Sequence, residues 1–90
     1  MNVYCDKRKR EYSMKLSEAV GKRLKNLLTE RNMTQYQLCK SGGIPRSTIS
    51  VIAEGKYNTV KLDTIYQIVA TLGITLKDFF NDSMFDEIQD

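Results

Sequence analysis

Apolar residues recur at helical spacing in the first half of the chain. Positions related as i, i+4, i+7 and i+8 lie on one face of an α-helix. The residues on this face are Val20, Leu24, Leu27 and Leu28. The opposite face carries Lys22, Arg23, Lys25 and Asn26. Ser17 can cap this helix and Arg31 suits its last turn, so the pattern predicts a helix from about residue 17 to about residue 31.

A second helical repeat begins at Leu62 and is closed by Gly73. Its apolar residues form a broad stripe, which consists of Leu62, Ile65, Tyr66, Ile68, Val69 and Leu72. Directly after it, Thr75 and Asp78 come close to a capping box, which predicts a short last helix. We expect this helix to bury its three large apolar residues, Leu76, Phe79 and Phe80.

Between the two repeats, the pattern predicts two short helices joined by a tight turn. Thr34 and Gln37 have the spacing of a capping box, so a helix should begin at Gln35. The glycines at 42–43 stop that helix, because glycine accepts the positive φ of a helix C-terminus. Pro45 suits the first turn of the next helix, where its missing N–H group has no partner to lose.

The helix after this turn has an apolar and a mostly polar side. Ile49 and Ile52 lie three residues apart on one face, and Gly55 ends the helix. The residues that point elsewhere are Arg46, Ser47, Ser50 and Val51. A short polar surface that begins with an arginine therefore faces outward.

The elements together predict an all-α domain of five helices. Ninety residues with 41% hydrophobic content suit one small domain, here residues 16–80, between a basic N-terminal arm (1–15) and an acidic tail (81–90). Residues 1–25 hold eight Lys or Arg against three acids, a net of +5, whereas residues 76–90 hold one Lys against five acids, a net of −4. This asymmetry indicates nucleic-acid contact at the basic end.

Both ends of the chain leave alternatives open. The arm contains four basic residues at 7–10 without a clean helical period. It can be disordered, bind phosphates or a minor groove, or pair with another subunit. The tail carries Met84, Phe85 and Ile88 among its acids, so it is either a frayed end or a helix whose apolar edge meets a second subunit.

Several classes of site are excluded by the residue types. With no His, and with only Cys5 and Cys39, the chain has too few ligands for zinc, so we expect no metal or cofactor and two free thiols. It also lacks clustered carboxylates outside the tail and a Gly-rich phosphate loop, which argues against an enzyme. No apolar run reaches the roughly 18 to 20 residues of a membrane span. We expect a cytoplasmic protein associated with the nucleoid.

The run from Leu24 to Phe80 resembles the helix-turn-helix family of Cro and the phage repressors, also called the XRE family. The matching markers are Thr34-Gln35, Gly43-Ile44, Arg46-Ser47-Thr48-Ile49-Ser50, Glu54-Gly55-Lys56, Leu62, Leu72-Gly73-Ile74 and Leu76. The resemblance implies a lambda-repressor-like fold whose third helix enters the major groove of DNA. It also implies that Gln35 anchors a phosphate and that four residues face base edges, namely Arg46, Ser47, Ser50 and Val51.

The chemistry of these residue types agrees with the resemblance. Arg46 can offer two N–H groups to guanine O6 and N7, a pairing worth roughly 1 to 3 kcal/mol of discrimination. The two serines specify little because a hydroxyl both donates and accepts, and Val51 can only meet a thymine methyl group. Further residues suited to phosphates are Thr48, Lys56, Tyr57, Asn58 and Lys61.

We therefore expect a sequence-specific regulator of transcription that binds double-stranded DNA, a repressor acting as a dimer on a near-palindromic operator. Two-fold partners would place their reading helices about 34 Å apart. The candidate dimer contacts are Phe80, Met84, Phe85 and Ile88, with the N-terminal arm as the other candidate surface. The alternative is an antitoxin-like module that uses the same fold to bind a partner protein.

Overall fold

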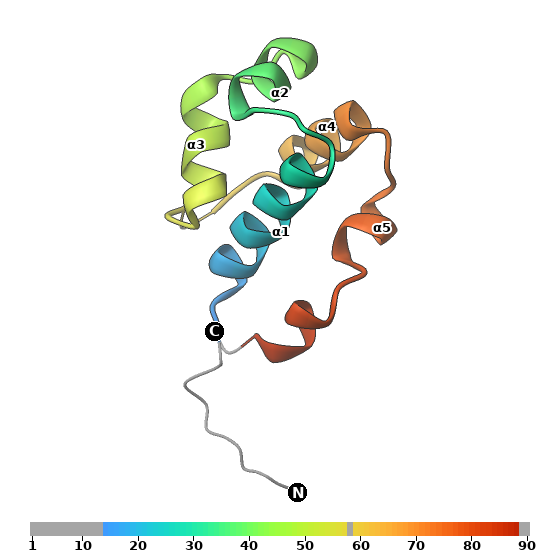
Figure 1. Cartoon of the computed structure of the whole chain (residues 1–90). Coiled ribbons are helices and arrows are strands. Elements are labelled where there is room, and N and C mark those ends of the chain that lie inside the picture. The colour runs from blue at the N-terminus through green and yellow to red at the C-terminus, as the bar shows by residue number, and fades with distance from the viewer. Residues whose placement is uncertain (1–13, 58, 89–90) are drawn as a thin grey trace, which may run out of the picture.

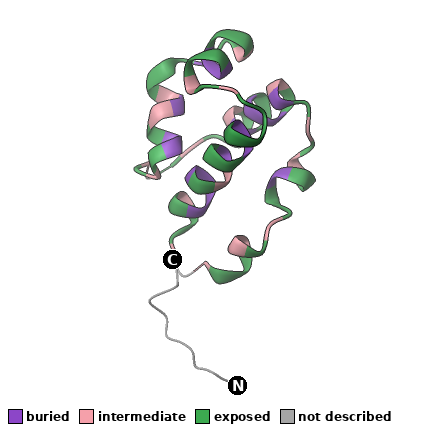
Figure 2. Ribbon diagram, viewed as in Figure 1, coloured by how far each residue is buried: buried purple, intermediate pink, exposed green. Residues whose placement is uncertain are grey.

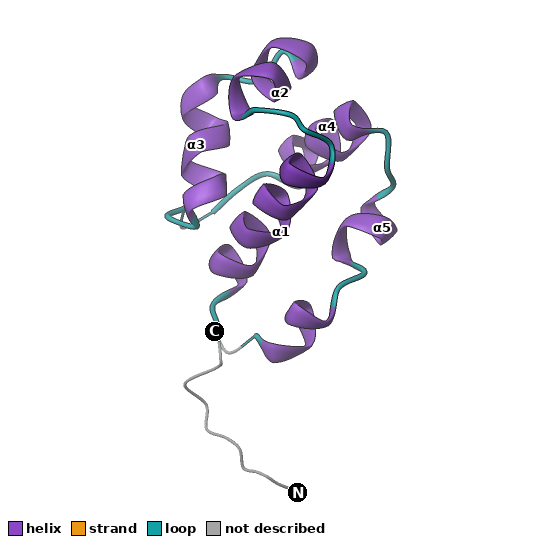
Figure 3. Cartoon of the chain, viewed as in Figure 1, coloured by secondary structure: helices purple, strands orange, loops and turns teal. Residues whose placement is uncertain are grey.

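The computed structural model describes residues 14–57 and 59–88, which form five α-helices and one short 3₁₀ helix (Figure 1). In chain order these are α1 (Leu16–Glu30), α2 (Gln35–Gly42), α3 (Arg46–Glu54), α4 (Leu62–Leu72), α5 (Leu76–Phe80) and η2 (Ser83–Glu87). Residues 14–57 and 59–88 contain no β-strand (Figure 3). The predicted all-α fold with five helices is confirmed. None of the described helices is long and apolar enough to cross a membrane.

The helices enclose one core, to which each of the five α-helices contributes (Figure 2). α3 packs against α1 and α2, and α4 packs against α2 and α5. The largest side chains with less than 2% of their surface exposed are Leu24, Leu38, Ile49, Ile52, Ile68, Val69 and Phe79. Burial of each of these side chains contributes about 1.5 to 3 kcal/mol to the stability of the fold. The short helices are therefore held in place by their apolar inward faces.

Gly21 allows α1 and α3 to approach closely. It lies within α1, where helix propensity alone favours alanine. A Cβ atom at this position would lie 2.6 Å from the carbonyl oxygen of Ile52 and 2.7 Å from that of Ala53. Both oxygens belong to the backbone of α3, so neither can rotate away. The position of α3 therefore depends on a residue of α1 that has no side chain.

The N-terminus of α1 lies slightly earlier than predicted. Lys15 is the N-cap residue, and its backbone N–H donates a hydrogen bond of 2.9 Å to Oε1 of Glu18. Ser17 is part of the first turn of the helix, so the prediction that it caps the helix is wrong. The reason is that Glu18 stands three residues after Lys15 and its carboxylate reaches back to the free amide.

The apolar stripe predicted on α4 is too wide. Four of its residues are buried, namely Ile65, Ile68, Val69 and Leu72. Leu62 and Tyr66 are instead 65% and 59% exposed. They lie four residues apart on the outer face of α4, which no described element covers.

The C-terminal segment also differs from the prediction. Phe79 is buried, Leu76 is half-buried and Phe80 is 37% exposed, so α5 does not bury all three residues. After α5, the chain forms η2 and packs Phe85 against the core. The ring centroid of Phe85 lies 5.0 Å from the ring centroid of Phe80 and 6.3 Å from that of Phe79.

Arg23 holds this segment against α1, although the pattern places it on the solvent face. Its Nε donates to the carbonyl oxygen of Phe79 at 2.7 Å, and its Nη2 donates to that of Asp78 at 2.8 Å. Its Nη1 also lies 3.6 Å from Oδ2 of Asp82. A helical period cannot reveal these partners, because they lie more than fifty positions later in the chain.

Candidate nucleic-acid interface

α2 begins at the predicted capping box. The backbone N–H of Gln37 donates to Oγ1 of Thr34 at 3.1 Å, and the backbone N–H of Thr34 donates to Oε1 of Gln37 at 2.8 Å. Gln35, the first residue of α2, takes no part in this reciprocal pair and is half-buried. Its side chain is therefore not occupied by the capping of its own helix.

The turn between α2 and α3 is fixed at three consecutive residues. Gly43 is the C-cap of α2 and has a left-handed backbone (φ 66°), which glycine adopts without steric cost. The next residue, Ile44, donates its N–H to the carbonyl oxygen of Cys39 at 3.2 Å and buries its side chain. Pro45 then leads into α3. The angle between the two helices is thus set by backbone geometry and by a buried anchor.

The sequence pattern predicts that Pro45 lies in the first turn of α3. It is instead the N-cap residue, one position before the helix begins. Its carbonyl oxygen accepts the N–H groups of Thr48 at 3.1 Å and Ile49 at 3.2 Å. Because the side chain of proline has no acceptor, no side chain caps the first amides of α3. These amides point out of the helix end and suit an anionic group.

α3 buries one face and exposes the other, as predicted. Ile49, Ile52 and Ala53 are in the core. Arg46 and Ser47 are exposed, Val51 is 42% exposed and Ser50 is half-buried. The four residues expected to read bases are thus on or beside the outward face of one helix.

Arg46 contacts a residue of α2 that the sequence pattern does not single out. Its guanidinium carbon lies over the ring of Tyr36, 5.7 Å from the ring centroid. Tyr36 stands in the first turn of α2 and is 55% exposed. The two residues are ten positions apart, so only the angle of the turn brings them together.

A shallow hollow of about 280 Å³ lies between the outward side of α3 and the loop that follows it. Its lining residues are Ser47, Thr48, Val51, Ile52, Tyr57, Thr59 and Val60. Of the predicted residues it brings together Ser47, Thr48, Val51 and Tyr57. Thr59 and Val60 were not predicted, because no local pattern shows that the loop returns along α3.

The residues expected to contact phosphates have different surroundings. Lys56 is exposed, and its Nζ lies 3.7 Å from Oε1 of Glu54, a solvent-exposed ion pair of little strength. Tyr57 is half-buried and packs against the core. Lys61 is exposed at the N-cap of α4. Asn58 lies outside the described residues.

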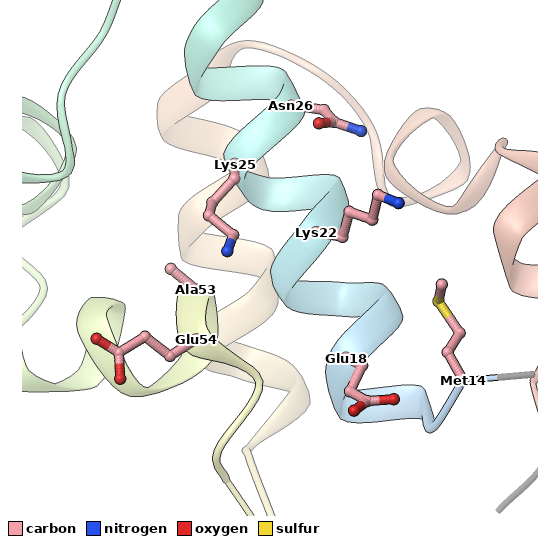
Figure 4. A pocket seen from close by; sticks show the side chains of 7 residues that line it. All are labelled: Met14, Glu18, Lys22, Lys25, Asn26, Ala53 and Glu54. Atoms are coloured by element: carbon pink, nitrogen blue, oxygen red, sulfur yellow. The ribbon is translucent and has the colours of Figure 1, made fainter. Parts of the chain in front are cut away.

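A larger hollow, of about 550 Å³, lies on the side of α1 next to the C-terminal end of α3 (Figure 4). It is lined by Met14, Glu18, Lys22, Lys25, Asn26, Ala53 and Glu54. Figure 4 shows Lys25 directed from α1 towards Ala53. This hollow has mixed charges and contains none of the predicted DNA-contacting residues. Within the described ranges, no three His, Cys, Asp or Glu side chains are grouped so that they can hold a metal ion.

Comparison with known proteins agrees with this geometry. A family model described as the Cro/C1-type HTH DNA-binding domain matches residues 23–83. A curated relative from Archaeoglobus fulgidus, an uncharacterized HTH-type transcriptional regulator, is 37% identical over 65 residues. The matched region covers 72% of this chain and 86% of the relative.

Solved structures with the same arrangement of helices include two restriction-modification controller proteins and a prophage protein. The prophage Lp1 protein 11 is 32% identical with a TM-score of 0.72, and the match covers 82% of this chain and 99% of that one. The restriction-modification controller C.AhdI from Aeromonas hydrophila is 28% identical with a TM-score of 0.66, over 71% and 96% of the two chains. The controller C.Esp1396I, solved as a tetramer with its natural 35 base-pair operator, is 25% identical with a TM-score of 0.69, over 80% and 92%.

Proposed function

The chain belongs to the Cro/C1-type helix-turn-helix DNA-binding family, and from this premise we propose that it represses transcription as a homodimer on a near-palindromic operator. Membership of the family confirms that the chain is a transcription regulator that binds DNA and is not an enzyme. The repressor role, the dimer and the individual contacts below are parts of the proposal.

Arg46 is the main base-reading residue in this proposal. It is exposed at the first position of α3, and no ion pair engages it within residues 14–57 and 59–88. The guanidinium group can therefore present two N–H groups to O6 and N7 of a guanine in the major groove. This availability is the observation that carries the assignment.

The other residues of the outward face contribute less to discrimination. Ser47 and Ser50 can pair with more than one base, because each hydroxyl donates and accepts. Val51 contacts a thymine methyl group at the edge of the hollow beside α3. With one strong reader, much of the specificity comes from operator shape and from the spacing of two half-sites.

Phosphate contacts surround the reading helix in the proposed complex. Gln35 at the start of α2 and the uncapped amides of α3 bind phosphates of the DNA backbone on one side of the groove. The further proposed phosphate contacts are Thr48, Lys56, Tyr57, Lys61 and, outside the described residues, Asn58. These contacts set affinity and register and carry no sequence information themselves.

The dimer is proposed to form through the C-terminal segment. Of the four predicted contact residues, Phe80 is exposed, whereas Met84, Phe85 and Ile88 are half-buried. Ile88 also pairs with Met14, so residue 14 of the N-terminal arm lies beside this segment. The operator-bound tetramer of C.Esp1396I supports assembly on DNA in a similar protein.

The experiment that tests the function compares duplex binding by wild type, Arg46→Ala and Lys77→Ala. Lys77 is an exposed cation on α5, away from α3 in Figure 1, and serves as the matched control. A preferred site is first enriched from random duplexes with wild type, and affinity is then measured at two salt concentrations. We expect steep salt dependence for all three proteins and loss of site preference only in Arg46→Ala.

Two results would contradict the proposal. One is a lack of duplex affinity at low salt in the wild-type protein. The other is an unchanged site preference in Arg46→Ala, which would remove Arg46 from the base-reading surface.

A further inference from the structure

Tyr36 and Arg46 form an aromatic and cationic pair across the turn between α2 and α3. The guanidinium carbon of Arg46 lies over the ring of Tyr36 at 5.7 Å from its centroid. Attraction between a guanidinium group and an aromatic face operates within about 6 Å. The contact therefore links the first turn of the second helix to the first residue of the third.

This contact leaves the hydrogen-bonding groups of Arg46 available. α2 contains no acidic residue, and the acid of α3, Glu54, stands at the opposite end of that helix. In the described part of the chain, the N–H groups of Arg46 make no hydrogen bond or ion pair with protein. The ring thus holds the guanidinium group through its face, while the five N–H donors remain free to meet a base.

The backbone that carries the ring is fixed by the start of α2. Tyr36 lies between the two members of the capping box, Thr34 and Gln37. The turn that carries Arg46 is anchored by the left-handed Gly43 and the buried Ile44. The backbone positions from which the ring and the arginine extend are consequently fixed by the fold itself.

We infer that Tyr36 is a positioning residue for Arg46, which keeps its guanidinium group on the DNA-facing side of the turn before binding. A long arginine side chain loses rotamer freedom when it pairs with a base, and a contact that already restricts it reduces that loss. The inference rests on the proposed role of Arg46 as base reader and adds to it a residue on a different helix.

The test uses Tyr36→Leu and Tyr36→Phe, with Tyr66→Leu as the matched control. Tyr66 is also an exposed tyrosine on a helix surface, but it lies on α4. Because Tyr36 is 55% exposed, its replacement opens no core cavity, and a thermal unfolding measurement on each variant checks that it is folded. The base pair read by Arg46 is identified as the one whose substitution weakens binding of wild type but not of Arg46→Ala.

The measured quantity is discrimination at that base pair, the ratio of affinities for the preferred and the substituted site. We expect Tyr36→Leu to lower the ratio about two- to five-fold, the effect of an exposed contact of this kind. Tyr36→Phe keeps the ring, so its ratio should equal that of wild type, as should that of Tyr66→Leu. In Arg46→Ala, adding Tyr36→Leu should cause no further loss.

The variants separate this inference from the function on which it rests. If Arg46→Ala abolishes discrimination but Tyr36→Leu leaves the ratio unchanged or raises it, the positioning role is overturned and the base-reading role stands. If Tyr36→Leu and Tyr36→Phe both weaken binding to all duplexes equally, Tyr36 acts through its hydroxyl on a phosphate and the positioning role is again overturned. If Arg46→Ala itself keeps the ratio, base reading by Arg46 fails first.

Discussion

The Nε group of Arg23 donates a hydrogen bond of 2.7 Å to the carbonyl oxygen of Phe79 and so joins the first helix to the end of the last α-helix. The same guanidinium group binds the carbonyl oxygen of Asp78 and lies beside the carboxylate of Asp82. Since the last carbonyl groups of a helix lack intrahelical partners, the half-buried guanidinium group of Arg23 donates to two of them at once. α5 has only five residues, so its stability depends on this anchor and on burial of Phe79.

Replacing Arg23 by methionine should destabilise the fold more than other arginine substitutions. The variant loses charged hydrogen bonds, each worth about 1.5 to 3 kcal/mol in the free energy of unfolding. Arg31→Met is the control, because Arg31 is exposed and its Nη1 lies 3.9 Å from Oε1 of the adjacent Glu30. Urea unfolding of both variants measures the difference. Equal destabilisation would show that the Arg23 contacts contribute nothing specific.

Gly21→Ala should be destabilising even though alanine is the better helix former. The added methyl group meets two carbonyl oxygens of α3, and such overpacking costs about 1 to 3 kcal/mol. Asn26→Ala, at an exposed position of the same helix, should leave stability the same or slightly higher. Thermal or urea unfolding provides the comparison. If Gly21→Ala is as stable as Asn26→Ala, the two helices do not need this close approach.

Val51 should make binding sensitive to a single methyl group of the operator. Replacing one thymine at a time by uracil removes that methyl group without changing the hydrogen bonds of the base. We expect one thymine in each half-site whose replacement costs wild type about 0.8 kcal/mol, the contribution of one buried carbon. Val51→Ala should lose this sensitivity, whereas Leu62→Ala, exposed on α4, should keep it. If no thymine has this effect in wild type, Val51 does not contact a base.

Phe80 and Phe85 should affect different properties of the protein. Phe85 packs within its own chain, so Phe85→Ala should lower the free energy of unfolding by about 0.5 to 3 kcal/mol. Phe80 is more exposed, and Phe80→Ala should mainly raise the dissociation constant of the proposed dimer, as measured by analytical ultracentrifugation. Leu62→Ala controls for loss of an exposed apolar side chain elsewhere. If Leu62→Ala weakens the dimer and Phe80→Ala does not, the interface lies on α4.

Local signals in the sequence determine most helix limits of this protein. The capping box of Thr34 and Gln37 and the left-handed Gly43, Gly55 and Gly73 act within a few residues of themselves. The same is true of the apolar period that turns Ile49 and Ile52 inward and leaves Arg46 outside. Such features need no knowledge of distant partners, which is why the helix-turn-helix and its outward residues were predictable.

The tertiary structure alone decides which residues meet across helices. Gly21 touches the backbone of α3, Arg23 holds the end of α5, and the ring of Tyr36 lies beneath Arg46. These relationships depend on the angles and distances between packed helices. A repeat of three or four residues contains no information about them. Periodicity describes one helix and not the neighbours that cover it. It therefore placed Leu62 inside and Arg23 outside, whereas Leu62 is exposed and Arg23 is bound to α5.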